Sequence, residues 1–251
     1  MDKFVIEGGK ILKGSIAASG AKNSVLPILA ASIMASGVSV IRNVPHLQDV
    51  STMIRILEYL GAKITFKNET IEIDTTGINK FDAPYEFVKT MRASISLLGP
   101  LVARFGRAQF SLPGGCVIGP RPIDLHIKGL QKLGADIDIE DGYVVASVKN
   151  GLKGNYIFLG GSFGSSVLAT ANVMCAATLA KGTTVIEFAA CEPEIVDLAN
   201  FLVKMGAKIT GIGSPCLTVY GVKKLKPVEH KIIPDRIETG TFLLAGAITK
   251  G

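Results

Sequence analysis

Leu60-Gly61-Ala62-Lys63-Ile64 recurs twice in this chain, as Leu133-Gly134-Ala135-Asp136-Ile137 and as Met205-Gly206-Ala207-Lys208-Ile209. The three glycines are 73 and 72 residues apart. Apolar residues precede each glycine at helical spacing, and a strand-like run follows it. A glycine just beyond the last helical residue is a common helix end, because glycine adopts the left-handed conformation without strain. The stretch therefore predicts three copies of a unit in which a helix leads into strands.

The helical stripe holds apolar side chains 11, 4 and 1 positions before each glycine: Val50, Leu57 and Leu60, then Ile123, Leu130 and Leu133, then Ile195, Leu202 and Met205. The strand-like runs after the glycines cover residues 62–66, 135–139 and 207–212. A more apolar helix precedes the stripe in each copy, at 23–35, 93–104 and 167–180, with a strand following at 38–41, 108–112 and 183–187. Because these helices carry few charges on any face, we expect an α/β (α+β) fold with buried helices and outer sheets.

One loop differs between the copies. Pro113 to Pro122 places Cys116 among glycines and prolines, five residues before Arg121. At the position of Cys116 the other copies hold Asn43 and Phe188, so the repeat does not require the thiol. A guanidinium nearby would favour the thiolate and provide a proton donor or a nucleophile. The alternative is a cysteine in a surface turn with an unrelated arginine.

The starts of the buried helices form a second group of candidates. Helix N-termini expose unpaired N–H groups and bind anions, and Lys22 and Arg92 add positive charge there. Lys22-Asn23 opens the first helix, and Ser165-Ser166 precedes the third. The alternatives are solvated charges for Lys22 and Arg92 and ordinary N-capping for the two serines. If the copies surround one axis, these helix starts point to one end of the domain.

Composition limits the function classes. The 251 residues are 48% hydrophobic and 19% charged, with a net charge of +6 and no tryptophan. Scattered basic residues favour a small anionic ligand and give no nucleic-acid stripe. The four cysteines have no CxxC spacing and the three histidines do not cluster with them, so we expect no metal. The N-terminus shows no cleavable apolar segment, and the uncharged run from Asn23 to Ile41 is interpreted as a buried helix and a strand. A cytoplasmic protein without membrane insertion is expected.

Several motifs together resemble the UDP-N-acetylglucosamine 1-carboxyvinyltransferase family. They are SGAKN at 19–23, MRAS at 91–94, PGGC at 113–116, RPIDLH at 121–126, EPEIVD at 192–197 and PDRIETGT at 234–241. The resemblance runs in order through all 251 residues. It implies transfer of enolpyruvate from phosphoenolpyruvate to the 3-hydroxyl of UDP-N-acetylglucosamine, with release of phosphate, in peptidoglycan precursor synthesis. The implied mechanism is addition followed by elimination and needs no cofactor.

The resemblance also implies the fold and its division into domains. The family fold is an inside-out α/β barrel, or prism, built from three helix-and-sheet units, which agrees with the repeat. Residues 22–233 are expected to form one complete domain. Residues 1–21 and 234–251 are expected to form an incomplete part of a second, similar domain.

Roles follow from the resemblance residue by residue. Cys116 matches the proton donor that also forms a covalent adduct with phosphoenolpyruvate. Lys22 and Asn23 match positions that bind phosphoenolpyruvate. The sugar nucleotide is assigned to the remaining matched residues: Arg92, Arg121, Pro122, Ile123, Asp124, Leu125, Ser165 and Ser166. Through Arg121, this set also reaches the phosphoenolpyruvate phosphate.

Two departures from the family qualify these expectations. Family members are longer, so the general base and further arginines are expected beyond Gly251, and this chain alone is expected to be incomplete and inactive. Leu168 stands where the family commonly has glycine, beside the sugar-nucleotide pocket. One alternative is a truncated or decayed fragment that binds ligand without turnover. Another is a transferase like 5-enolpyruvylshikimate-3-phosphate synthase, which lacks the cysteine loop.

Overall fold

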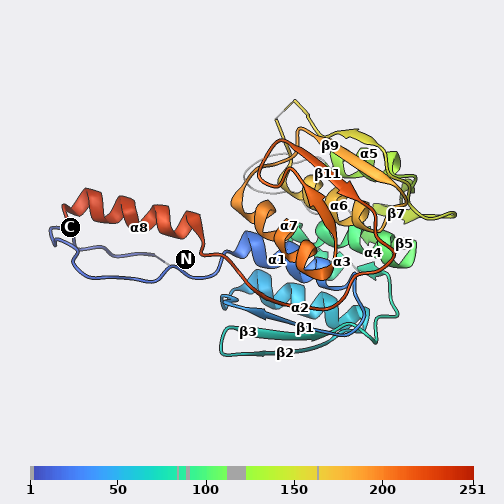
Figure 1. Cartoon of the computed structure of the whole chain (residues 1–251). Helices are drawn as coiled ribbons and strands as arrows, with labels where there is room; N and C mark the ends of the chain where they lie inside the picture. Colours follow the sequence, from blue (N-terminus) through green and yellow to red (C-terminus); the bar gives the residue numbers. More distant parts are fainter. Residues whose placement is uncertain (1–2, 84, 89–90, 112–122, 163) are drawn as a thin grey trace.

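Three four-stranded sheets surround a set of central helices, and a long helix with an extended segment projects from one end of this body (Figure 1). The structure is a computed structural model that describes residues 3–83, 85–88, 91–111, 123–162 and 164–251. The expected enclosure of helices by outer sheets is confirmed.

The three sheets repeat one strand order. Their strands, in spatial order, are β12 (Glu229–Lys231), β1 (Val38–Arg42), β3 (Thr70–Asp74) and β2 (Lys63–Lys67); β4 (Asp82–Ala83), β5 (Arg107–Ser111), β7 (Tyr143–Ser147) and β6 (Asp136–Glu140); and β8 (Tyr156–Phe158), β9 (Thr183–Glu187), β11 (Cys216–Tyr220) and β10 (Lys208–Thr210). In every sheet the first pair is parallel and the next two pairs are antiparallel. Each sheet therefore has at one edge a strand, paired in parallel, that the sequence pattern did not predict. The first unit takes this strand, β12, from the far end of the chain.

The inner helices are buried along most of their length. They are α1 (Lys22–Ser32), α6 (Val167–Thr178) and, in the second unit, the 3₁₀ helix η1 (Arg92–Leu97) continued by α4 (Leu98–Phe105). Every residue of α1 from Ser24 to Ser32 is buried. The uncharged run from Asn23 to Ile41 thus divides into α1 and β1, as expected. The continuous helix predicted at 93–104 is replaced by η1 and α4.

The second helices are amphipathic, and each packs one face against an inner helix. They are α2 (Gln48–Leu60), α5 (Asp124–Lys132) and α7 (Pro193–Met205); a short α3 (Tyr85–Val88) lies in the second unit. The glycines of the repeat end them: Gly61 and Gly206 both have φ 109° and Gly134 has φ 95°. The predicted helix ends are confirmed at all three positions, because each glycine is in the left-handed region that side chains disfavour.

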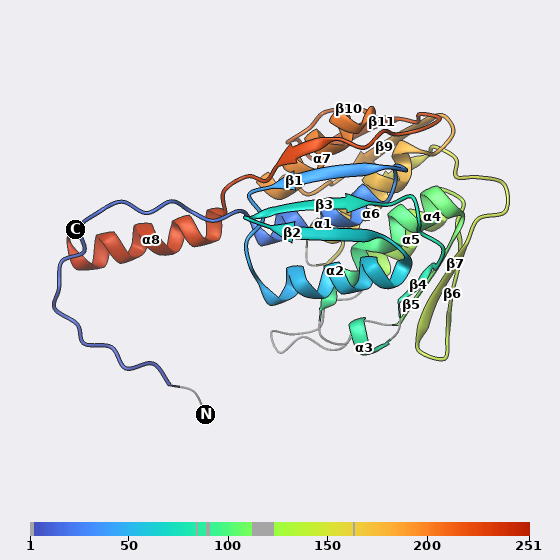
Figure 2. The same ribbon diagram turned by 90° about the horizontal axis from the view of Figure 1, so that it is seen from below.

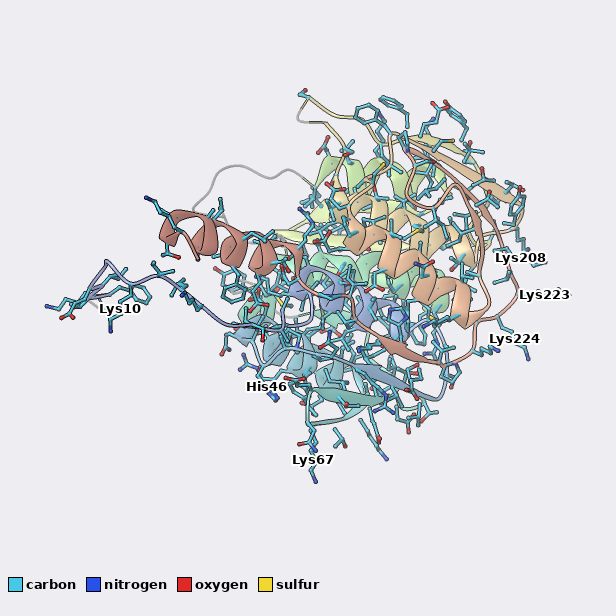
Figure 3. All side chains as sticks on the ribbon, turned by 60° about the vertical axis from the view of Figure 1, so that its left-hand side comes forward. Lys10, His46, Lys67, Lys208, Lys223 and Lys224 are labelled. Atoms are coloured by element: carbon cyan, nitrogen blue, oxygen red, sulfur yellow. The ribbon has the colours of Figure 1, made fainter. Side chains whose placement is uncertain are left out.

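The C-terminal ends of the three inner helices meet at one cavity of about 580 Å³. Its lining includes Met34, Arg104 and Leu179, one from just after or within the last turn of each helix. The Arg104 Nη1 atom donates to the carbonyls of Ile33, at 2.5 Å, and Ala35, at 2.9 Å, so a guanidinium pairs with the negative end of α1. Lys223 and Lys224 lie on this side, away from the projecting helix (Figure 3). The helix starts therefore share the opposite end, as the repeat predicted.

The chain enters and leaves the body side by side at that opposite end. Gly20 forms a β-bridge with Pro234, and the Ala21 N–H donates to the Ile233 carbonyl at 2.9 Å. The projecting helix α8 (Arg236–Thr249) follows directly and has no buried residue. The extended segment before Gly20 runs along α8 and then away from it (Figure 2).

Candidate functional site

The first turn of α1 presents Lys22 and Asn23 at the end of the body where the chain crosses. The residue before the helix, Ala21, supplies no side-chain cap for the first N–H groups of α1. Lys22 Nζ forms an ion pair with Asp49 Oδ2 of α2 at 2.9 Å, with both side chains more than a third exposed. Asn23 is exposed. This turn offers an anion a helix N-terminus and a lysine whose carboxylate partner holds it only loosely in water.

The start of α5 holds Ile123, Asp124 and Leu125. Ile123 and Leu125 are half-buried, and Asp124 is exposed in the first turn of the helix. Leu125 contacts the Gly161 loop, since a Cβ on Gly161 would lie 3.4 Å from Leu125 Cδ1. The structure thus brings the predicted α5 residues next to the loop that leads to α6.

Ser165 and Ser166 begin α6. The Ser166 side chain accepts a hydrogen bond from the Ala169 N–H at 3.3 Å, so Ser166 is the N-cap of α6. Ser165 is exposed and lines a cavity of about 460 Å³ together with Cys191 and Glu192. The Glu192 Oε2 atom is shielded from solvent and has no hydrogen-bond partner among the described residues. A ligand hydroxyl or amide entering this cavity could satisfy it.

A buried amide connects the helices of the second and third units. Asn172 of α6 donates from Nδ2 to the Ile95 carbonyl of η1 at 2.9 Å and accepts at Oδ1 from the Gly99 N–H at 2.8 Å. Its Nδ2 atom also lies 2.7 Å from Nδ1 of the buried His126, which therefore accepts. Asn172 fixes the second and third units relative to each other at the axis.

Three predicted residues lie outside the described part of the chain. They are Cys116, Arg121 and Pro122; for Arg92 the structure describes the backbone, which opens η1. Among the other cysteines, Cys175 is buried in α6, and burial raises the pKa of its thiol to about 12. Cys175 therefore packs in the core. Cys191 and Cys216 are exposed free thiols.

Sequence reasoning missed the acidic partners of the site. Asp49 lies one helix away from Lys22 in space and 27 positions away in sequence, so no local spacing pointed to it. Asp197 and Glu194 of α7 are nearly fully buried although charged. The sequence signal that could have identified them is their place on the apolar face of an amphipathic helix, where carboxylates are rare. Within the described ranges, no three His, Cys, Asp or Glu side chains gather as a metal site, and no helix has the length and apolarity to cross a membrane.

The fold matches that of solved transferases. The enolpyruvyl transferase NikO from Streptomyces tendae superposes with a TM-score of 0.82 at 24% identity, over 96% of this chain and 56% of that one. EPSP synthase from Acinetobacter baumannii gives 0.75 at 20% identity, over 96% of this chain and 54% of that one. These likenesses establish the fold, and the predicted inside-out α/β barrel is confirmed.

Sequence comparison establishes the family. The model of the EPSP synthase (3-phosphoshikimate 1-carboxyvinyltransferase) family matches residues 6–251, and this chain belongs to that family. Curated relatives from Salmonella gallinarum and Salmonella newport, both called UDP-N-acetylglucosamine 1-carboxyvinyltransferase, are 56% identical over all 251 residues. The expected resemblance is confirmed. The chain spans 59% of the length of these relatives.

Proposed function

We propose that this chain takes part in transferring enolpyruvate from phosphoenolpyruvate to the 3-hydroxyl of UDP-N-acetylglucosamine. The observation that carries the proposal is the 56% identity of the chain, across its full 251 residues, to transferases named for this sugar nucleotide. The anion-binding turn at Lys22 and the cavity beside Ser165 support it, since both lie at the helix-start end of the body. The described free thiols agree with a cytoplasmic setting, which we propose with it.

In the proposed reaction, Cys116 gives a proton to the methylene carbon of phosphoenolpyruvate, and the sugar hydroxyl adds to C2. Loss of phosphate from C2 and of a proton from the methyl carbon then restores the double bond. Lys22 and Asn23 bind the donor, with the lysine paired to phosphate as a point charge. Arg92, the segment from Arg121 to Leu125, and Ser165 with Ser166 bind the sugar nucleotide. A covalent adduct between Cys116 and the donor belongs to the same site.

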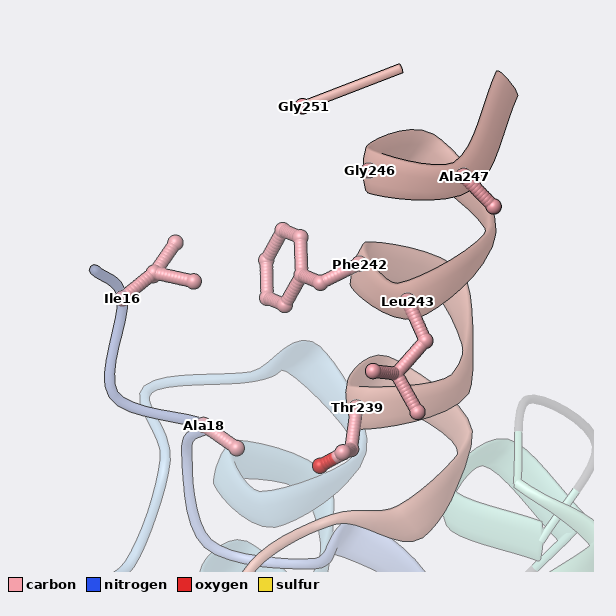
Figure 4. Close-up of a pocket in the computed structure, with 8 residues that line it drawn as sticks. All are labelled: Ile16, Ala18, Thr239, Phe242, Leu243, Gly246, Ala247 and Gly251. Carbon is pink, nitrogen blue, oxygen red and sulfur yellow. The ribbon is translucent and has the colours of Figure 1, made fainter. Parts of the chain in front are cut away.

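We also propose that residues 22–233 form one complete domain and that residues 1–21 and 234–251 belong to a second. Exposed apolar side chains support this division. Phe4 and Ile6 are 97% and 85% exposed, and Leu243 and Leu244 of α8 are 70% and 73% exposed. Ile16 and Phe242 face each other across a cavity of about 380 Å³ between the extended segment and α8 (Figure 4). Side chains of this kind are usually buried, and a second domain would cover them.

Limited trypsin digestion tests the division. We expect cleavage after Lys10 and Lys13, which lie in the exposed extended segment, at least about tenfold faster than cleavage within residues 22–111 or 123–233. Mass spectrometry of the first products measures this order, and the urea-unfolded chain gives the control in which the order disappears. First cuts inside residues 22–111 or 123–233 would contradict the proposed boundaries.

Phosphate release tests the transfer itself. In a form of the protein that continues past Gly251, we expect phosphate release from phosphoenolpyruvate only when UDP-N-acetylglucosamine is also present, and not with shikimate 3-phosphate. The 251-residue chain alone is expected to release none, because the general base is expected beyond it. Cys116→Ala is expected to slow release by at least about 100-fold, because a general acid contributes that much. Cys216→Ala, which removes an exposed thiol of β11, is the matched control and should keep the rate. Binding of both substrates by the longer form without phosphate release would contradict the proposed transfer and favour a ligand-binding role.

A further inference from the structure

A buried carboxylate joins three separate elements where the chain crosses into and out of the body. Asp197 of α7 is 4% exposed. Its Oδ2 atom accepts a hydrogen bond from the Ser24 hydroxyl of α1 and one from the Ile233 N–H at 3.4 Å. Its Oδ1 atom lies 2.9 Å from Nε2 of His230, a residue of β12 that is also 4% exposed. A charge this deeply buried requires such partners to be tolerated.

The histidine's protonation follows from its other neighbour. Lys204 Nζ lies 3.3 Å from His230 Nδ1, and an ammonium can only donate, so Nδ1 accepts. The proton of a neutral imidazole is then on Nε2, from which it is donated to Asp197. Asp197 therefore accepts from three donors at once, and Lys204, an exposed residue, supplies the compensating positive charge.

A second carboxylate of α7 reaches the same crossing. Glu194, one helical turn before Asp197 and 3% exposed, binds the Arg236 guanidinium at 3.0 and 3.3 Å. Residues three apart share a helix face, so α7 directs both acids at the outgoing segment from Ile233 to Arg236. Asp197 also accepts a hydrogen bond from Ser24 of α1. Ser24 lies in the first turn of that helix, two residues after Lys22.

We propose that Asp197 is a positioning residue that locks the first turn of α1 to the outgoing segment. Through Ser24 it fixes the turn that carries Lys22 and Asn23, and through Ile233 and His230 it fixes the chain that leaves the body toward α8. Displacement of the outgoing segment then disturbs the anion-binding turn, and an anion bound at the turn steadies the outgoing segment. The lock rests on the observed hydrogen bonds, while its effect on phosphoenolpyruvate rests on the proposed function.

Hydrogen exchange tests the lock without any ligand. In Ser24→Ala we expect amides of both segments, 19–24 and 231–235, to exchange about tenfold faster, because the hydroxyl that joins α1 to Asp197 is lost. Ser32→Ala is the matched control: it removes an equally buried serine from the same helix, whose hydroxyl donates only to the Leu29 carbonyl at 2.7 Å. Asp197→Asn, which must leave at least one donor of the three unpaired, should accelerate both segments further.

A calorimetric titration with phosphoenolpyruvate separates positioning from general weakening. We expect Ser24→Ala to bind about fivefold more weakly than Ser32→Ala at a similar melting temperature. Unchanged exchange at 231–235 in both Ser24→Ala and Asp197→Asn would overturn the lock whatever the titration gives. If the unmodified chain failed to bind phosphoenolpyruvate, the proposed donor site would be contradicted, and accelerated exchange would still support the lock.

Discussion

Replacing Gly20 with alanine is expected to lower the free energy of unfolding by about 3 kcal/mol, as overpacking of a rigid site does. Gly20 is buried at the crossing, where it forms the bridge with Pro234. A Cβ at this position would collide with the carbonyl oxygen of Asn43 and lie 2.9 Å from its carbonyl carbon. Asn43 cannot move freely, since its Nδ2 atom donates to the Ile232 carbonyl at 2.9 Å.

Thermal unfolding followed by circular dichroism measures this effect. For a chain of this size, about 3 kcal/mol corresponds to a melting temperature lower by roughly 6–12 °C. Gly8→Ala is the control, because Gly8 lies in the same N-terminal segment with no atom within 4 Å of the added methyl group. Equal melting temperatures for the two variants would show that the crossing is not packed as described.

Replacing Lys22 with glutamine is expected to weaken phosphoenolpyruvate binding by at least about tenfold, because a hydrogen bond to a charged group contributes about 1.5–3 kcal/mol. Isothermal titration calorimetry on this chain measures the change. Asp49→Asn provides the opposite test: it releases the Lys22 ammonium from its 2.9 Å ion pair, so affinity for the anionic donor should rise a few-fold.

The control for charge alone is Lys224→Gln. Lys224 lines the cavity at the C-terminal ends of the inner helices, on the side of the body away from α8 (Figure 3). Its removal lowers the net charge by the same amount and should leave the affinity unchanged. Equal weakening by both substitutions would mean that the protein attracts the donor through its overall charge, and Lys22 would lose its assigned role.

The repeated phrase around Gly61, Gly134 and Gly206 was enough to predict most of the fold, because helix periodicity and a left-handed helix end are local properties. The leading strand of each unit was not predictable in this way. β4 has two residues and β8 and β12 have three each, too few to show alternation, and they are defined by pairing with a distant strand. Non-local pairing leaves no mark on a short run of sequence.

The 3₁₀ start of the second inner helix also escaped prediction. Pro100 has no N–H to offer the Ser96 carbonyl four residues earlier. The hydroxyls of Ser94 and Ser96 donate to the carbonyls three residues before them, Met91 and Ala93, at 2.8 and 2.6 Å. Both effects favour the tighter i to i+3 geometry over an α-helix. The proline and the two serines are visible in the sequence, whereas the hydrogen bonds of the serines are seen in the structure.

For the candidate site, the sequence identified the cationic and polar residues at the helix starts but not their acidic partners. Lys22 was expected to bind an anionic ligand, and the structure shows that it forms an ion pair with Asp49. The role of Asp197 was not predicted, because its partners Ser24 and His230 are 173 and 33 positions away in the sequence. Buried ion networks depend on where the fold brings residues together, which spacing along one helix cannot reveal.

The parallel pairing of β12 with β1 has a consequence for synthesis on the ribosome. Val40 faces Glu229, so the first sheet cannot be completed until nearly all of the body has been translated. At about 5–20 residues per second, the open edge of β1 waits roughly 10–40 s for its neighbour. An unpaired strand edge invites association with other nascent chains, and the exposed Arg42 at its end provides the charge that discourages this. β12, the last strand of the body to be translated, therefore completes the first of its three sheets.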